Sequence, residues 1–167
     1  LIKELGLDNT EAEKLFQRYH AKVPFIRALQ DQCARVAIER GYIKTFAGRR
    51  CRFDRWESRY ERTPPLPLEE AKEKYGNDLK RSYTYKALNR LIQGSAADMT
   101  KLAMIGLWEE GIVPHLQVHD EVDISIENTE QANTVTRIME NCVQLAVPLL
   151  VDIELGKSWG ETKEIIK

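Results

Sequence analysis

Apolar and polar residues alternate between residues 115 and 126, which is the periodicity of a half-buried β-strand. Leu116 and Val118 lie before an acidic stretch, and Val122 and Ile124 lie after it. Keeping these side chains on one face pairs Val118 with Val122, because a slip of one residue would turn one arm's apolar residues to the other face. The pattern therefore predicts a β-hairpin whose loop is the three residues between that pair.

Apolar residues recur at helical spacing in four other stretches. They predict helices over residues 10–22, 24–41, 79–110 and 128–145. Thr10 and Glu13 have the spacing of a capping box, and Asn128 is a typical cap for the last helix. Gly41 is the residue type that commonly ends a helix, so we expect the second helix to end there.

A second hairpin is predicted between residues 42 and 53, with its tip at residues 47–50. The tip carries Arg49 and Arg50, whose guanidinium groups can contact phosphate oxygens in pairs. A soluble turn explains the same two residues equally well. The remaining expected elements are an irregular linker at 54–66, a short helix at 67–75 ended by Gly76, and a strand at 146–155.

These elements predict an α+β fold in which an antiparallel sheet with a β-hairpin is backed by long helices. We expect three parts. Residues 1–41 form a helical pair, residues 42–80 an arginine-rich hairpin with an irregular insertion, and residues 81–167 the long helix, the acidic hairpin, a helix and a final strand.

Composition narrows the class of protein. A chain of 167 residues suits one domain, and no apolar run approaches the roughly 18 residues that span a membrane. The three cysteines are far apart and lack metal-ligand spacing, which predicts reduced thiols in a cytosolic compartment. Residues 40–62 contain eight basic and three acidic residues, whereas the chain after Trp108 contains twelve acidic and four basic residues. This asymmetry suits phosphate binding in one part and cation binding in another.

Two residue sets are candidates for chemistry. Asp120 and Glu121 would lie beside His119 at an exposed tip, where carboxylates can hold a divalent cation, although acidic residues also favour turns for conformational reasons. Asn89 and Gln93 are one helical turn apart. Their carboxamides offer the donors and acceptors that minor-groove base edges match, although most such side chains only face water.

Four motifs follow one another along the chain: residues 41–52, residues 87–103, residues 117–122, and residues 147–149 with 156–159. In this order and at these separations they closely resemble the C-terminal palm and fingers part of family A DNA polymerases, the bacterial DNA polymerase I type also used by phages. The resemblance covers nearly the whole chain outside residues 54–80.

The resemblance implies template-directed nucleotidyl transfer with two Mg²⁺ ions. Asp120 would be one of two aspartates that bind the metal pair, Glu121 an accessory carboxylate, and His119 a contact near the primer 3′ end. It further implies that Asn89 and Gln93 touch the nascent primer–template duplex. The implied partners are primer–template DNA and a deoxynucleoside triphosphate.

By the same resemblance, Arg49 and Arg50 would approach the DNA backbone. The implied setting is the cytoplasm of a bacterial or phage-infected cell, with no membrane partner.

Parts of the family pattern are missing from this sequence. No Asp-Tyr-Ser-Gln motif, which carries the second metal-binding aspartate, occurs. Residues 1–7 resemble the segment shortly after the fingers helix that clamps the nucleotide, so we expect the chain to begin just past that helix. One aspartate cannot hold two metals, so we expect this polypeptide to need the N-terminal portion of the polymerase for activity.

Two other functions compete with this one. The chain could be a non-catalytic DNA-binding module derived from a polymerase palm, which would keep its DNA contacts without Asp120. A metal hydrolase built on His119 and Asp120 is the weaker alternative, because no further metal-ligand cluster surrounds them in the sequence.

Overall fold

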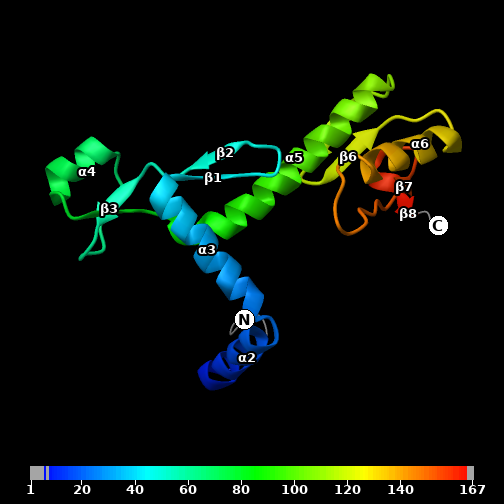
Figure 1. Ribbon diagram of the computed structural model, residues 1–167. Coiled ribbons are helices and arrows are strands. Elements are labelled where there is room, and N and C mark those ends of the chain that lie inside the picture. Colours follow the sequence, from blue (N-terminus) through cyan, green and yellow to red (C-terminus); the bar gives the residue numbers. More distant parts are fainter. Residues whose placement is uncertain (1–5, 7, 165–167) are drawn as a thin grey trace. The chain divides into compact units, whose positions relative to one another are not determined.

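The computed structural model describes residue 6 and residues 8–164, and the chain divides into two compact units, Leu1–Ile92 and Gln93–Lys167 (Figure 1). The segment 1–7 that resembles the sequence after the fingers helix lies outside the described residues except for Gly6. Helices combine with small antiparallel sheets, which confirms the predicted α+β class.

The first unit contains α2 (Asn9–Lys22), α3 (Pro24–Arg40), β1 (Tyr42–Lys44), β2 (Arg50–Arg52), β3 (Trp56–Ser58), α4 (Leu68–Tyr75), β4 (Leu79–Arg81) and η1 (Thr84–Lys86). Helix α5 (Ala87–Glu109) begins in this unit and continues into the second. The second unit adds β5 (Pro114–Val118), β6 (Glu121–Ile124), α6 (Thr129–Glu140), β7 (Glu154–Leu155), η2 (Trp159–Glu161) and β8 (Lys163–Glu164).

Helix α2 starts slightly earlier than predicted. Its capping box joins Asp8 and Glu11 rather than Thr10 and Glu13, because the Asp8 side chain accepts from the Glu11 backbone N–H at 2.8 Å and the Glu11 carboxylate accepts from the Asp8 N–H at 3.2 Å. No residue of α2 is buried, so its predicted apolar stripe stays exposed within the described chain.

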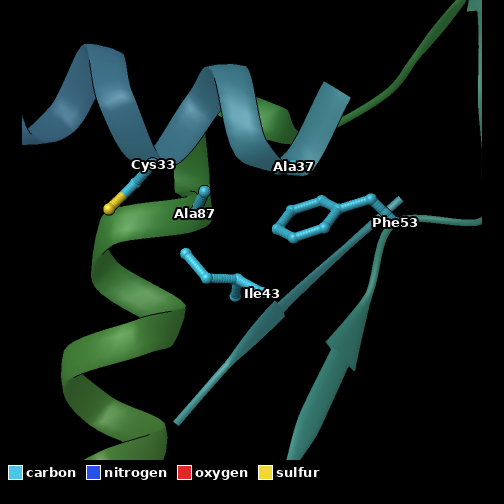
Figure 2. Packing of buried hydrophobic residues seen from close by; sticks show 5 residues of the cluster. All are labelled: Cys33, Ala37, Ile43, Phe53 and Ala87. Carbon is cyan, nitrogen blue, oxygen red and sulfur yellow. The ribbon is translucent and has the colours of Figure 1, made fainter. Parts of the chain in front are cut away.

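The core of the first unit forms where α3, the first hairpin and α5 meet. Cys33 and Ala37 of α3 pack with Ile43, Phe53 and Ala87 (Figure 2). The chain can turn directly from α3 into β1 at the residue after Arg40, a glycine in the left-handed conformation at φ 74°, so the predicted helix end is confirmed.

The first hairpin has shorter strands than predicted. Tyr42 pairs with Arg52 and Lys44 with Arg50, so Arg50 lies within β2 and only Arg49 belongs to the turn. The turn is closed by the Thr45 N–H, which donates to the Arg49 carbonyl at 2.9 Å. The prediction that both arginines occupy the tip was therefore wrong for Arg50, because the ladder extends one pair further.

The insertion is more regular than predicted. Residues 54–66 were expected to be irregular, but they contain β3, and the predicted long helix does not begin at Leu79, because residues 79–81 form β4. Trp56 and Arg81 are cross-strand partners. Tyr83 then takes a left-handed φ of 62°, which separates β4 from α5 and delays the helix to Ala87. The short helix α4 ends before Gly76 as predicted.

In the second unit, α5 and α6 pack closely. Leu107 is fully buried on α5, and a Cβ atom added at Gly106 would lie 2.9 Å from Cγ2 of Ile138 on α6. Helix α6 begins after the predicted cap Asn128, whose side chain accepts from the Gln131 N–H at 3.0 Å. Gly106 therefore allows the two helices to approach.

The end of the chain is less regular than predicted. Helix α6 stops at Glu140, and the predicted strand 146–155 is reduced to β7. Pro148 has no N–H for a ladder, and the Val151 N–H donates to the Glu140 carboxylate at 3.2 Å instead of to a strand. A β-branched composition without a partner strand therefore does not make a sheet here.

Two further predictions concern whether the cysteines are free and whether any segment could span a membrane. Cys33, Cys51 and Cys142 are free thiols, as predicted. Among the described residues, no helix combines the length and apolar character that crossing a membrane requires.

Candidate nucleic-acid and metal site

The acidic hairpin turns through two residues rather than three. Val118 pairs with Glu121, which leaves His119 and Asp120 as the turn and makes Glu121 the first residue of β6. His119 has a φ of 56°, in the left-handed region that tight two-residue hairpin turns require. The predicted pairing of Val118 with Val122 was therefore wrong.

This register also changes which side chains share a face. Leu116 pairs with Asp123 and Gln117 with Val122, so Leu116 and Val118 lie on one face of the ribbon and Val122 on the other. Leu116 remains 44% exposed. The alternating pattern predicted the two strands correctly but not their register, because it assumed that every apolar residue shares one buried face.

Both carboxylates of the candidate site face solvent. Asp120 is exposed at the turn, as predicted, and Glu121 is exposed at the start of β6. The Gln117 side-chain amide donates to the His119 carbonyl at 2.7 Å, which braces the turn from within β5. The Trp159 indole N–H donates to Oε1 of Glu121 at 3.4 Å. The turn therefore presents Asp120 from a braced backbone.

The carboxylate oxygens at this turn are the type of ligand that a divalent cation binds, but there are too few of them for a complete site. Carboxylate oxygens are the ligands that Mg²⁺ prefers. Within the part of the chain that the structure describes, no group of three or more His, Cys, Asp and Glu side chains could hold a metal ion. Among the described residues, Asp120 and Glu121 are therefore an incomplete set of metal ligands.

The amides of α5 are presented as predicted. Asn89 and Gln93 are both exposed and lie one turn apart on the helix. Between them, Leu91 is partly buried against the core cluster of the first unit, which fixes the rotation of the helix at Asn89.

The two arginines of the first hairpin have different settings. Arg49 is exposed in the turn, and its backbone N–H donates to the Thr45 hydroxyl at 3.1 Å. The guanidinium of Arg50 lies 4.8 Å from the centre of the ring of Tyr42, its diagonal neighbour on β1. This stacking orients the Arg50 side chain along the ribbon.

Two supporting arginines were missed by the sequence analysis. Arg90 on α5 lies 4.7 Å from the centre of the Phe53 ring and donates to the Arg52 carbonyl at 3.2 Å. Arg81 donates to the Phe53 carbonyl at 2.8 Å. Together they hold the end of β2 next to the start of α5. The contacts join residues 28 to 38 positions apart, and local pattern carries no signal for such pairs.

The chain is similar to proteins of known activity. The sequence profile of DNA polymerase family A matches residues 1–161. A DNA-directed DNA polymerase of Pseudomonas phage M6 is 40% identical over 152 residues, covering 91% of this chain and 20% of the phage protein. The thermostable DNA polymerase I of Thermus aquaticus is 34% identical over 172 residues, covering 98% of this chain and 19% of the relative.

A solved structure is also similar. The POL domain of Pol1 from M. smegmatis, in complex with DNA primer-template and dNTP, superimposes with a TM-score of 0.63 at 27% identity, covering 89% of this chain and 25% of that one. The chain spans about a fifth of the length of the curated relatives it matches.

Proposed function

Because the chain belongs to DNA polymerase family A, we propose that it forms the part of a DNA-directed DNA polymerase that carries the acidic hairpin and a duplex-contacting helix. The observation that carries this proposal is the exposed Asp120 on a braced two-residue turn. The substrates proposed are primer–template DNA and a deoxynucleoside triphosphate, the ligands of the M. smegmatis neighbour. The setting proposed is the cytoplasm of a bacterial or phage-infected bacterial cell.

Asp120 is proposed as a carboxylate ligand of the catalytic Mg²⁺ ions, with Glu121 as an accessory carboxylate. When bound, the two ions supply positive charge that favours ionisation of the primer 3′ hydroxyl and offsets charge on the departing pyrophosphate. The braced turn fixes the backbone that carries Asp120, so little backbone reorganisation is needed as the reacting groups meet. His119, adjacent on the turn, is proposed to contact the primer end.

The exposed amides and arginines are proposed to hold the duplex. Asn89 and Gln93 offer donors and acceptors at successive helical turns, which suits the minor-groove edges of a duplex of any sequence. Arg49 and Arg50 are proposed to contact phosphates. Phosphate contacts supply affinity that falls with salt and carry no sequence information, as a polymerase requires.

The proposed enzyme needs residues that this sequence does not contain. No Asp-Tyr-Ser-Gln motif occurs in it, so a second aspartate and the nucleotide-clamping helix are proposed to come from the N-terminal portion of the polymerase, in the same or a separate chain. The chain alone is therefore expected not to extend a primer.

The test is reconstitution of primer extension. The chain is mixed with the N-terminal polymerase portion, a primer–template, four deoxynucleotides and Mg²⁺, and product length is followed on a gel. We expect extension from the mixture and its loss with Asp120→Asn. The matched control Asp123→Asn, on β6, removes an equal charge outside the turn and is expected to keep extension. No extension from the folded mixture, or equal extension by Asp120→Asn, would contradict the proposal.

A non-catalytic DNA-binding module remains the second candidate, favoured by the shortage of metal ligands among the described residues. Under this alternative the chain binds DNA without a partner, and Asp120→Ala leaves affinity unchanged or slightly higher because a negative charge is removed. Fluorescence anisotropy with a labelled duplex, combined with the extension assay, separates the two.

A further inference from the structure

Trp159 has a contact that the proposed function does not use. Its indole N–H lies 3.4 Å from Oε1 of Glu121, a residue 38 positions away, while the side chain stays 59% exposed. A tryptophan that mainly fills a core would be largely covered. We infer that Trp159 is a positioning residue for the acidic hairpin, which orients the Glu121 carboxylate for a divalent cation. This inference rests on the proposed function of that hairpin.

The segment carrying Trp159 is itself tightly constrained. A Cβ atom added at Gly156 would lie 2.5 Å from the Glu161 carbonyl oxygen, so the backbone before and after Trp159 approaches too closely for any other residue. The Glu161 N–H donates to the Ser158 carbonyl at 3.0 Å and closes the turn. The loop therefore fixes the backbone that carries the indole.

The strands on either side of this loop anchor it further. Glu154–Leu155 of β7 pairs with Lys163–Glu164 of β8, and the Thr162 hydroxyl donates to Oε2 of Glu154 at 2.7 Å. The indole thus projects from a closed strand–loop–strand unit. A donor on such a unit loses little conformational freedom when it binds a carboxylate, so it can orient its partner at low entropic cost.

Glu121 lies directly next to the turn, so a contact that orients Glu121 also restricts the turn. It pairs with Val118 in the last step of the ladder, so its backbone directly borders His119 and Asp120. The contact occupies one oxygen of Glu121 and leaves the other available to a cation.

A neutral hydrogen-bond donor such as the indole N–H suits a carboxylate that has to bind a cation. An indole N–H donates but carries no charge, so it orients the carboxylate without offsetting the negative charge that attracts a cation. A lysine or arginine at the same place would compete with the metal.

The first experiment mixes the chain with a tryptophan-free version of the N-terminal polymerase portion, which supplies the remaining metal ligands. It uses Mn²⁺ alone as the probe, because this paramagnetic ion quenches a nearby indole. Replacing Trp56 and Trp108 by Phe leaves Trp159 as the single tryptophan of the full chain. We expect saturable quenching that Mg²⁺ reverses and that Asp120→Asn removes. The matched control titrates the same single-tryptophan chain with diamagnetic Mg²⁺ alone, which is expected to leave the indole emission unquenched.

The second experiment tests positioning by measuring, in the same mixture with the N-terminal polymerase portion, Mn²⁺ affinity from the electron paramagnetic resonance signal of the free ion. Trp159→Phe keeps a ring and removes the donor, and we expect affinity to fall roughly three- to tenfold, the range for one hydrogen bond. In a Glu121→Gln chain the same substitution should have no further effect. Far-UV circular dichroism checks that each variant stays folded.

The outcomes separate the two proposals. If Asp120→Asn weakens Mn²⁺ binding and Trp159→Phe does not, the positioning role is wrong and the function of the hairpin stands. If Trp159→Phe weakens binding equally with and without the Glu121 carboxylate, the contact is not the cause and the inference is also wrong. If neither Asp120→Asn nor Trp159→Phe changes Mn²⁺ binding, both proposals fail.

Discussion

Arg81 and Gly41 provide a direct test of how the insertion is joined to the first unit. The Arg81 guanidinium donates to the Ile38 carbonyl at 3.2 Å and to the Phe53 carbonyl at 2.8 Å, and it lies 4.4 Å from the centre of the Trp56 ring. Arg81 thus donates both to a carbonyl in the last turn of α3 and to the carbonyl of the residue that follows β2. We predict that Arg81→Ala destabilises this unit more than a typical surface substitution does.

The size of the effect follows from the contacts. Each hydrogen bond is worth about 1 kcal/mol where solvent is near, the ring contact about 0.5–1 kcal/mol, and a cation at the end of a helix about 0.5 kcal/mol. Arg81→Ala should therefore lower the free energy of unfolding of the first unit by about 3 kcal/mol. Replacing a surface arginine without such contacts by alanine would lower the free energy of unfolding by less than about 0.5 kcal/mol.

Gly41 turns this into a double-mutant cycle. Its φ of 74° makes any side chain unfavourable by about 1 kcal/mol, and an added Cβ would lie 2.8 Å from Cζ of Arg81. Gly41→Ala should therefore cost about 3 kcal/mol in the natural chain, because it also displaces Arg81. In an Arg81→Ala chain only the backbone cost of about 1 kcal/mol should remain.

The assay is urea unfolding followed by Trp56 fluorescence, in a chain whose Trp108 and Trp159 are replaced by Phe. Trp56 lies in the first unit, so its emission reports on that unit alone. We expect a coupling free energy of about 2 kcal/mol between the two substitutions. Additivity within about 0.5 kcal/mol would show that Gly41 and Arg81 act independently and would contradict this prediction, because independent sites add to that accuracy.

Three further predictions concern other parts of the chain. Leu107→Ala, at a fully buried position on α5, should destabilise the second unit by about 2–5 kcal/mol, measured by urea unfolding followed by Trp159 emission; a loss below about 1 kcal/mol would show that the site is not packed. Arg90→Leu should destabilise the first unit by about 1–2 kcal/mol in the Trp56 assay, because the Arg52 carbonyl loses its donor and Phe53 its cation, and an unchanged unfolding midpoint would contradict this. Burial raises the pKa of the Cys33 thiol above its ordinary value of 9.0, so its contribution to stability is complete below that pH and is lost as pH rises through the raised pKa. The free energy of unfolding, measured between about pH 8 and 11, should therefore fall with rising pH in the natural chain and fall less in Cys33→Ala. An identical pH profile for both chains would count against this prediction.

The parts of the fold that the sequence predicts well are those with local causes. The end of α3 at Gly41 and the start of α6 after Asn128 follow from the conformational preference of one residue and the hydrogen-bonding capacity of another. The exposed acidic turn at Asp120 is similarly local, since acidic residues flanked by alternating strands favour it.

The parts that were missed depend on partners far along the chain. Strand β4 replaces the start of a predicted helix because β3 offers a ladder about twenty residues earlier. Alternation cannot distinguish a two-residue from a three-residue turn, and the outcome here is set by the left-handed conformation of His119. Arg81, Arg90 and Trp159 act through carbonyl or carboxylate partners that no local pattern identifies.

The most direct test of the account is the rate of single-nucleotide incorporation by the reconstituted polymerase, with Asp120→Asn compared against Asp123→Asn under saturating primer–template, nucleotide and Mg²⁺. We predict that Asp120→Asn lowers the rate by at least about a thousandfold, which corresponds to about 4 kcal/mol of lost transition-state stabilisation. We predict a change of less than about threefold for Asp123→Asn. Equal rates for the two variants would contradict the claim that the turn of the acidic hairpin carries the chemistry.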